Sequence, residues 1–325
     1  MKKVTKVFSV MVASVALAAM LSGCGGDKKP AGGDTIKVGG NLEMTGGSAS
    51  FGISSKNAIE LAFKNINDKG GINGKKLELV VADNKSEAAE ATNAMQKLVS
   101  QDKVVAVIGP NLSSATIAAG AINNGSKVLD IAPMATNPNV TVDPATGKTK
   151  EYNFRACFID PFQGTVMANY AFKQGAKKVA IVQEVSNDYA VGLAKFFKEA
   201  FIKLTGDENS IVEIANYQTG DKDFSAILTN IKAKNPDAIF APGNFTESAL
   251  LVKQARQLGI EAPFMGGDTW ETQEFIDVGG KDVEGVALST AFDREKATTP
   301  EAKKFLDEYV KEYKGEPSAL TAMAY

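Results

Sequence analysis

The sequence predicts an α/β protein of two doubly wound lobes, each built around a parallel sheet. From residue 36 onward, short apolar runs rich in β-branched residues alternate with longer segments of helical periodicity, which is typical of βαβ units. The same alternation restarts after residues 153–156. Of the 325 residues, 302 remain when the first 23 are set aside, which is enough to bury two hydrophobic cores.

The first half of the chain holds four predicted strands and three predicted helices. The strands are residues 36–40, 77–82, 104–108 and 128–131, and the helices are residues 54–67, 88–99 and 114–122. In the first helix, the apolar residues fall on one face, which is the spacing of a helix that packs on a sheet. Segments rich in glycine and asparagine supply the breaks between elements.

The second half repeats this pattern and then extends it. Its strands are residues 179–182, 211–215, 238–241 and 264–265, and its helices are residues 162–172, 191–204, 224–232 and 248–257. A further strand is predicted within residues 285–292, followed by a helix at 301–313 and an apolar stretch at 319–325. Because this last stretch has neither a cap nor a polar tail, we expect native C-terminal residues to be missing; a genuine final helix is the alternative.

The first residues have the layout of an export signal. Lys2, Lys3 and Lys6 precede a mostly apolar run at 7–20, and residues 21–24 read Leu-Ser-Gly-Cys. This tetrapeptide resembles a bacterial lipobox, in which the cysteine, here Cys24, is lipidated and becomes the first mature residue. A transmembrane anchor is the alternative, but a run of about 14 residues falls short of the roughly 20 that span a bilayer.

The export signal sets the predicted processing and location. Residues 1–23 form the signal peptide, and residues 24–34 form a flexible tether, because the tether has no apolar residue larger than alanine and proline. We expect an extracytoplasmic protein that is lipid-anchored to a bacterial membrane, in the periplasm or on the outer face of the cell membrane.

Composition excludes several classes of function. The net charge is −2, and removal of residues 1–23 takes away three lysines and no acid, which leaves −5 and argues against a nucleic-acid partner. The chain has no histidine, so Ser-His-Asp and Cys-His catalysis and the usual zinc sites are absent. Residues 70–76 lack the spacing of a phosphate-binding loop, and residues 221–223 lack the glycine and glutamate of a calcium loop. We expect no cofactor and no metal.

Two loops in the first half could hold a carboxylate. In an open α/β sheet, ligands bind beyond the carboxyl ends of the strands. The segment 109–116 follows one strand and places Ser113 and free backbone N–H groups at a helix start, which suits an anion. Alternatively, Ser113 or Ser114 only caps its own helix. The segment 132–138 follows the next strand and offers Thr136.

Loops in the second half supply an acid and aromatic residues. Asp268 and Trp270 follow a glycine pair at a strand end, so Asp268 could receive an ammonium group; a helix cap is the alternative. Tyr189 and Phe245 also follow strand ends, and ordinary packing would account for each of them.

Several of these segments, in this order, resemble a known family. They are residues 70–75, 107–109 with 113–116, 135–138, 154–155 with Asp160 and 163–164, and 220–224. Over residues 36–325 the chain resembles the leucine/isoleucine/valine-binding proteins and related type I periplasmic-binding proteins of bacterial ABC importers. The resemblance implies an N-terminal lobe of residues 35–157 plus 289–325 and a second lobe of residues 158–288. The strand crossovers between the lobes would act as a hinge.

The resemblance also implies a binding site between the lobes. Ser113, Ala135 and Thr136 would take the carboxylate of an amino acid, and Asp268, where the best-known members have glutamate, would take the ammonium. The side-chain pocket would be formed by Phe51, Tyr189, Phe245 and Trp270. Some relatives brace the loop that corresponds to residues 109–116, called the serine loop below, with a cysteine pair that this chain lacks, so other contacts must hold the loop here.

These features predict a binding protein and not an enzyme. We expect a monomer that captures an amino acid, with branched aliphatic side chains favoured, and delivers it to an ABC permease and its ATPase subunits. The alternative is a binding protein or sensor for an amide, urea or an aromatic compound. A Rossmann-type enzyme is disfavoured because the dinucleotide fingerprint is absent. Leucine, isoleucine and valine are not ranked, because a methyl group changes binding by only about 1–3 kcal/mol.

Overall fold

A computed structural model describes residues 35–325 of the chain. The predicted signal peptide, the lipidation site Cys24 and the tether therefore lie outside the described residues. Within residues 35–325, every helix is too short or too polar to cross a membrane.

Two five-stranded parallel sheets form the framework, which confirms the predicted fold class. The first has the order β2-β1-β3-β4-β5, and the second has the order β10-β9-β8-β6-β7. The strands of the first sheet are β1 (Ile36–Leu42), β2 (Leu77–Asp83), β3 (Ala106–Ile108), β4 (Leu129–Ala132) and β5 (Asn153–Arg155). Those of the second are β6 (Val179–Glu184), β7 (Ile211–Tyr217), β8 (Ala238–Phe240), β9 (Phe264–Gly266) and β10 (Ala287–Leu288). The two sheets have the same topology. In each, the second strand along the chain lies on one side of the first strand and the later strands are added on its other side, so the strand order reverses beside the first strand.

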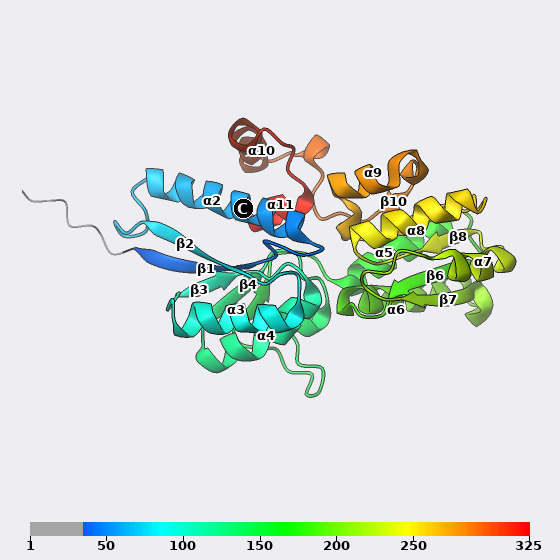
Figure 1. Cartoon of the computed structure of the whole chain (residues 1–325), viewed down its shortest axis with the longest axis horizontal. Helices are drawn as coiled ribbons and strands as arrows, with labels where there is room; N and C mark the ends of the chain where they lie inside the picture. Colours follow the sequence, from blue (N-terminus) through cyan, green and yellow to red (C-terminus); the bar gives the residue numbers. More distant parts are fainter. Residues whose placement is uncertain (1–34) are drawn as a thin grey trace, which may run out of the picture.

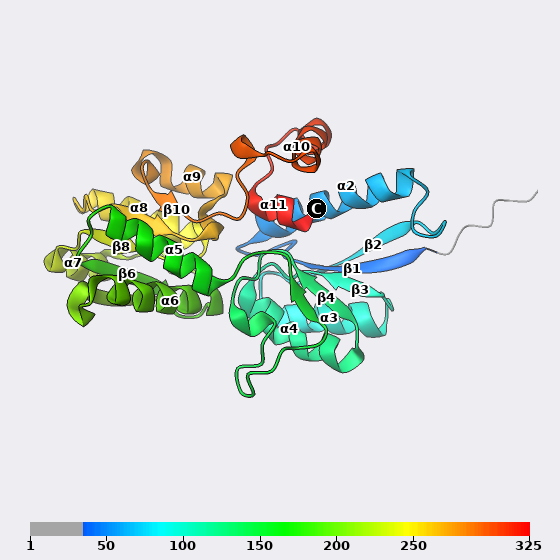
Figure 2. The same cartoon turned by 180° about the vertical axis from the view of Figure 1, so that it is seen from behind.

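Helices cover both sheets, and the two lobes lie side by side (Figures 1 and 2). The first lobe carries α2 (Ala49–Asp68), α3 (Ala88–Ser100) and α4 (Ser113–Ser126). The second carries α5 (Asp160–Lys173), α6 (Asp188–Thr205), α7 (Ser225–Lys234), α8 (Phe245–Gln257) and α9 (Gln273–Gly279). The final helices, α10 (Pro300–Tyr313) and α11 (Ala319–Ala324), return to the first lobe and pack against α2.

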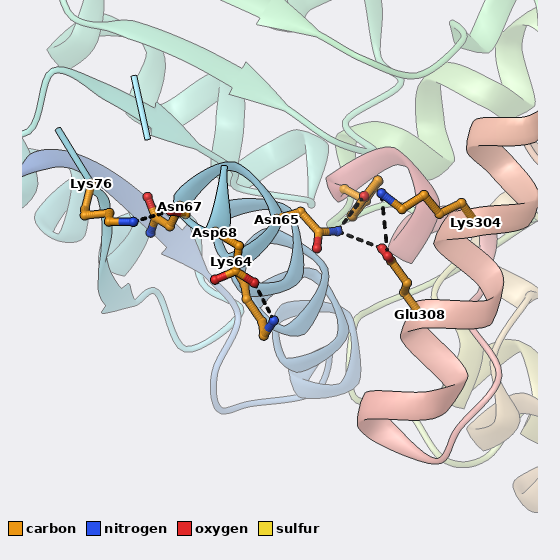
Figure 3. A network of polar contacts seen from close by, with 8 residues as sticks. Lys64, Asn65, Asn67, Asp68, Lys76, Lys304 and Glu308 are labelled. Carbon is orange, nitrogen blue, oxygen red and sulfur yellow. Dashed lines mark hydrogen bonds and ion pairs between the residues drawn. The ribbon is translucent and has the colours of Figure 1, made fainter. Parts of the chain in front are cut away.

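Polar contacts fasten this returning segment to the first lobe (Figure 3). The Asn65 side chain of α2 donates to Glu308 of α10 over 2.7 Å, and Glu308 also lies 3.6 Å from the ammonium of Lys304. At the end of α2, the Asn67 side chain exchanges two hydrogen bonds with the backbone of Leu77, at 2.7 and 2.9 Å. The helix is therefore tied to α10 on one side and to the start of β2 on the other.

Each lobe has its own apolar core. In the first lobe, Leu42 and Ile59 pack with Phe305 of α10, and a second cluster around Met95 and Leu98 fills the opposite side of the sheet. In the second lobe, aliphatic side chains pack with several aromatic rings, and the rings of Phe197 and Phe240 stack with centroids 4.0 Å apart. Burial of this apolar surface is the main stabilising contribution to the lobes.

Most of the predicted elements are confirmed, with the following differences. The short strand β5 and the helix α9 were not predicted, and the strand expected within 285–292 is reduced to β10. In addition, α2, α6 and α8 begin several residues before their predicted starts. The first turns of α2 and α8 meet across the lobes through Phe51 and Phe245, and the backbone of Asp188, at the start of α6, contacts Ser114 of the first lobe. These turns therefore do not follow the periodicity of the core.

Close packing of α5 on α6 gives a stability prediction. A Cβ atom at Gly164 would lie 2.6 Å from the backbone nitrogen of Phe197, so Gly164→Ala forces the two helices apart. We expect a loss of about 1–3 kcal/mol in the free energy of unfolding, measured by thermal or denaturant unfolding. Gly125→Ala, in the exposed last turn of α4 with nothing within 4 Å, should be neutral or stabilising by up to about 1 kcal/mol. Equal stabilities for the two variants would contradict the packing argument.

Candidate functional site

An internal cavity lies between the two lobes, at the carboxyl ends of both sheets. Ligands of open α/β sheets bind at this edge, where the strand order reverses. The first lobe contributes Phe51, Asn111, Leu112, Ser113, Met134 and Leu320, and the second contributes Asn187, Tyr189, Asn244, Asp268, Thr269 and Glu271. Four predicted site residues are therefore brought together across the cavity, and they are Ser113, Asp268, Phe51 and Tyr189.

The first-lobe wall is formed by the start of α4. Ser113 is the first residue of this helix and makes no capping hydrogen bond, so the alternative that it serves as a cap is wrong. Its hydroxyl accepts instead from the backbone N–H of Asn137 at 3.3 Å. Since the first N–H groups of a helix have no partner within it, this end presents donors and a partial positive charge to the cavity.

A half-buried arginine, Arg155, holds the neighbouring loop. The Arg155 guanidinium donates to the carbonyl oxygens of Ala135 and Asn137, both at 2.8 Å, and to the Thr141 hydroxyl at 2.8 Å. These bonds satisfy the carbonyl groups inside the lobe and fix the path of the loop after β4. The loop in turn supports Ser113 through Asn137.

Ala135 and Thr136 do not line the cavity in this structure, whereas Met134 does. Both residues are fully buried. The backbone oxygen of Thr136 accepts from the N–H of Asp160 at the start of α5, which turns this part of the loop toward the crossover between the lobes. The expected direct contact of Ala135 and Thr136 with a carboxylate is thus not seen in the geometry.

The second-lobe wall carries a buried carboxylate. Asp268 follows β9 and opens a short 3-10 helix, Asp268–Trp270, without capping it. One carboxylate oxygen accepts from the Tyr189 hydroxyl at 2.8 Å. Burial raises the pKa of Asp268 to about 6, and the hydrogen bond from Tyr189 opposes this rise. Glu271 lines the same wall, and the described lining contains neither lysine nor arginine.

The glycine pair before Asp268 makes room for two aromatic side chains. A Cβ at Gly267 would lie 1.9 Å from the Tyr189 hydroxyl, and one at Gly266 would lie 2.2 Å from the Trp270 ring. Trp270 does not line this cavity, because its ring stacks on Phe275 inside the second lobe with centroids 4.8 Å apart. The expected pocket role of Trp270 therefore has no support in this geometry.

Phe51 and Phe245 meet across the lobes. Their rings pack edge to face with centroids 5.2 Å apart, Phe51 from α2 and Phe245 from α8. Only Phe51 lines the cavity, and Phe245 supports it from behind. The pair is buried and joins the lobes beside the site.

Polar contacts also join the lobes. The backbone of Asp188 donates to the Ser114 hydroxyl at 2.9 Å and accepts from the Asn137 side chain at 2.7 Å. Glu271 accepts from the backbone N–H of Ala319, at the start of α11, at 3.2 Å. These contacts hold the two walls of the cavity against each other.

Sequence reasoning missed several lining residues. They are Asn111, Leu112, Met134, Asn187, Asn244, Thr269, Glu271 and Leu320. All but Leu320 lie close after the carboxyl end of a strand, so the rule that selected Ser113 and Asp268 could have selected them too. Leu320 arrives from the end of the chain, and no local sequence signal marks it.

Comparison with known proteins assigns the family. Residues 35–325 match the sequence profile described as "Periplasmic binding protein". The chain belongs to the periplasmic binding protein family. This family comprises binding proteins of the type used by ABC transporters, and its members are not enzymes. Membership implies an extracytoplasmic location, while lipid anchoring through Cys24 stays a prediction.

Relatives support the resemblance to leucine/isoleucine/valine-binding proteins. The substrate-binding protein LivJ of Streptococcus pneumoniae, solved in complex with isoleucine, is 39% identical, with a TM-score of 0.82 over 90% of this chain and 81% of that one. Leu/Ile/Val-binding protein homolog 1 of Brucella abortus is 32% identical over 294 residues, which are 89% of this chain and 75% of the relative. A solute-binding protein of Rhodopseudomonas palustris BisB5, in complex with 3,4-dihydroxy benzoic acid, is 27% identical, with a TM-score of 0.74 over 90% and 77% of the two chains.

The buried carboxylate of this family member predicts a pH-dependent stability. The folded-state pKa of Asp268, about 6, lies above its ordinary value of 3.8, so stability falls as pH rises from about 4 to 6. Above pH 6 the ionised Asp268 lowers the free energy of unfolding by about 3 kcal/mol, at 1.36 kcal/mol per pKa unit. Ligand-free Asp268→Asn should therefore be more stable than the parent at pH 8 by up to about 3 kcal/mol, and not at pH 4. Denaturant unfolding at the two pH values measures this, and the same gain at both would disprove it.

Proposed function

We propose that this chain is an extracytoplasmic binding lipoprotein that captures a branched aliphatic amino acid between its lobes and delivers it to an ABC permease. The observation that carries the proposal is that Ser113, at the α4 N-terminus, and the acid Asp268 line one cavity from opposite lobes. A free amino acid is a zwitterion, so it needs hydrogen-bond donors at one end and an anion at the other. The cavity offers both.

The two poles of the ligand would bind to opposite lobes. The Ser113 hydroxyl and the free N–H groups of the first turn of α4 would receive the carboxylate. Asp268 would receive the ammonium, as a charge-assisted hydrogen bond in a site from which water is largely excluded. In this proposal Ala135 and Thr136 support the serine loop from behind instead of contacting the ligand.

The rest of the lining suits an aliphatic side chain. Phe51, Leu112, Met134 and Leu320 contribute apolar surface from the first lobe, and the Tyr189 ring adds to it from the second. Apolar walls with a few placed polar groups are typical of small-molecule sites, where the walls select the side chain and the polar groups fix orientation.

Movement of the lobes would control access to the site. We propose that residues 35–157 with 289–325 move against residues 158–288 about the crossovers. A ligand held at both poles favours the closed form, because only that form presents both walls at once. The protein would then act without chemical turnover, as a monomer anchored through Cys24, with the permease and its ATPase subunits as partners.

An aromatic carboxylate is the second candidate ligand. The relative solved with 3,4-dihydroxy benzoic acid favours it, and Phe51 and Tyr189 could stack on such a ring. Isoleucine and this acid both carry a carboxylate, so the Ser113 wall could serve either. Asp268 separates the two, because a ligand without an ammonium group would leave that carboxylate buried and unpaired.

A ligand panel tests the proposed class. Ligand-stripped protein should show a dose-dependent rise in melting temperature with leucine, isoleucine or valine, because a ligand that binds only the folded state stabilises it. Urea, a simple amide and benzoate should produce no rise. Stabilisation by benzoate alone would overturn the amino-acid assignment and favour the alternative.

Mutation of Asp268 tests how the ammonium is bound. Asp268→Asn keeps the size of the side chain and removes its charge, so we expect a loss of about 2–5 kcal/mol in amino-acid binding, measured by calorimetry. Asp307→Asn removes an exposed carboxylate of α10 and should leave the affinity unchanged. Undiminished affinity in Asp268→Asn would refute its role.

The pH dependence of binding gives an independent check. Protonation removes the charge of Asp268, so parent affinity should fall as pH is lowered through about 6, approaching tenfold per pH unit. Asp268→Asn should lose this dependence while any residual binding remains measurable. A parent whose affinity is constant between pH 7 and pH 5 would contradict the assignment.

A further inference from the structure

We propose that Glu43 is a positioning residue that holds the loop before α4 in the geometry needed to bind a ligand carboxylate. The inference rests on the proposed function for the identity of the ligand. Glu43 follows β1 and is fully buried, with no exposed surface, and it does not itself line the cavity. It acts through Asn111, which does.

The Glu43 carboxylate accepts hydrogen bonds from the loop before α4. One oxygen accepts from the backbone N–H of Asn111 at 3.1 Å and lies 3.4 Å from that of Leu112. The other accepts from the Asn111 side chain at 2.7 Å. The Asn84 side chain donates to the same carboxylate from β2's end, at 3.2 Å. A carboxylate has about four acceptor sites, so one side chain can satisfy this set of donors.

The loop needs such an acceptor for a physical reason. Asn111 and Leu112 precede α4, so their N–H groups have no partner within the helix. Asn111 is buried and Leu112 is half-buried. Leaving a buried donor without an acceptor costs about 1–3 kcal/mol. Without Glu43 the loop would turn these groups toward the cavity or toward water, and Ser113 would move with them.

Asn111 is fixed from two sides. Its side-chain nitrogen donates to Glu43, and its side-chain oxygen accepts from the Ser55 hydroxyl of α2 at 3.2 Å. The backbone of Glu43 is fixed as well, because Gly52 of α2 packs closely on it. A Cβ atom at Gly52 would lie 2.2 Å from the backbone carbonyl oxygen of Glu43. Buried Asn41 continues the network by accepting from Asn84 at 3.2 Å. The network therefore lies beneath the point where the first sheet reverses, between β1 and β3.

The hydrogen bonds of Glu43 can brace the serine loop in the absence of a cysteine pair. Cys157 is the one free cysteine of the described residues, and it lies at the crossover between the lobes, not at this loop. A hydrogen-bonded carboxylate takes the place of a covalent brace. The prediction is that the acceptor geometry of Glu43, and not its charge, sets the position of the loop.

Three variants separate these effects. Glu43→Ala removes both acceptors. Glu43→Gln can restore the network, because its oxygen can accept the backbone N–H groups while its nitrogen donates to a flipped Asn111 amide, with Ser55 then acting as acceptor. Asp130→Ala is the matched control, since it truncates another fully buried carboxylate of the first lobe, in β4 and away from the cavity.

The first measurement is L-leucine affinity by calorimetry, beside the melting temperature of each ligand-free variant. We expect Glu43→Ala to bind at least tenfold more weakly, Glu43→Gln to stay within about threefold of the parent, and Asp130→Ala to keep parent affinity whatever its melting temperature. Parent affinity in Glu43→Ala would overturn the proposal. So would a folded Glu43→Gln that binds as weakly as Glu43→Ala.

The second measurement needs no ligand. Hydrogen exchange of the Asn111 and Leu112 amides in the ligand-free protein should accelerate in Glu43→Ala and return toward the parent rate in Glu43→Gln. Failure of the parent to bind any amino acid would sink the proposed function, whereas unchanged exchange of these amides in Glu43→Ala would sink the role of Glu43. The two failures are thus distinguishable.

Discussion

The buried carboxylate of Asp268 is the constraint around which the site is organised. Among the described residues it forms no ion pair, and the hydroxyl of Tyr189 is its main side-chain partner. Burial raises its pKa, which means that the ionised group is held at a cost to the folded protein. A bound cation can offset the free-energy cost of burying an ionised carboxylate. A ligand cation placed opposite the α4 N-terminus would do so and would complete the charge arrangement of both walls.

Precision at the two walls comes from residues behind them. On the first lobe, half-buried Arg155 donates to carbonyl groups of one loop, and buried Glu43 accepts from N–H groups of the other. On the second lobe, Gly267 allows the Tyr189 hydroxyl to approach Asp268. Binding groups are effective only when their supporting contacts lock them in place, and here those contacts come from distant parts of the chain.

Much of the fold and part of the site could be predicted without coordinates. Periodicity located nearly all helices and strands, because residues that face a sheet or core are selected for hydrophobicity at regular intervals. It failed at the first turns of α2, α6 and α8, whose buried residues Phe51, Tyr189 and Phe245 lie at or beside the cavity between the lobes. The strand-end rule located Ser113 and Asp268, but local sequence could not show that Met134 lines the cavity while Ala135 and Thr136 lie behind it.

Sequence alone thus determined the α/β class, the order of the elements and the kind of chemistry available, since those properties depend on local pattern and residue type. The tertiary structure alone decided which strand-end residues share a cavity, that Trp270 stacks inside its lobe, that Leu320 returns to the site, and that Glu43 lies beneath the serine loop. These facts depend on contacts between segments far apart in the chain. Such contacts leave no periodic signal in the sequence, because each is set by the packing of whole elements and not by neighbouring residues.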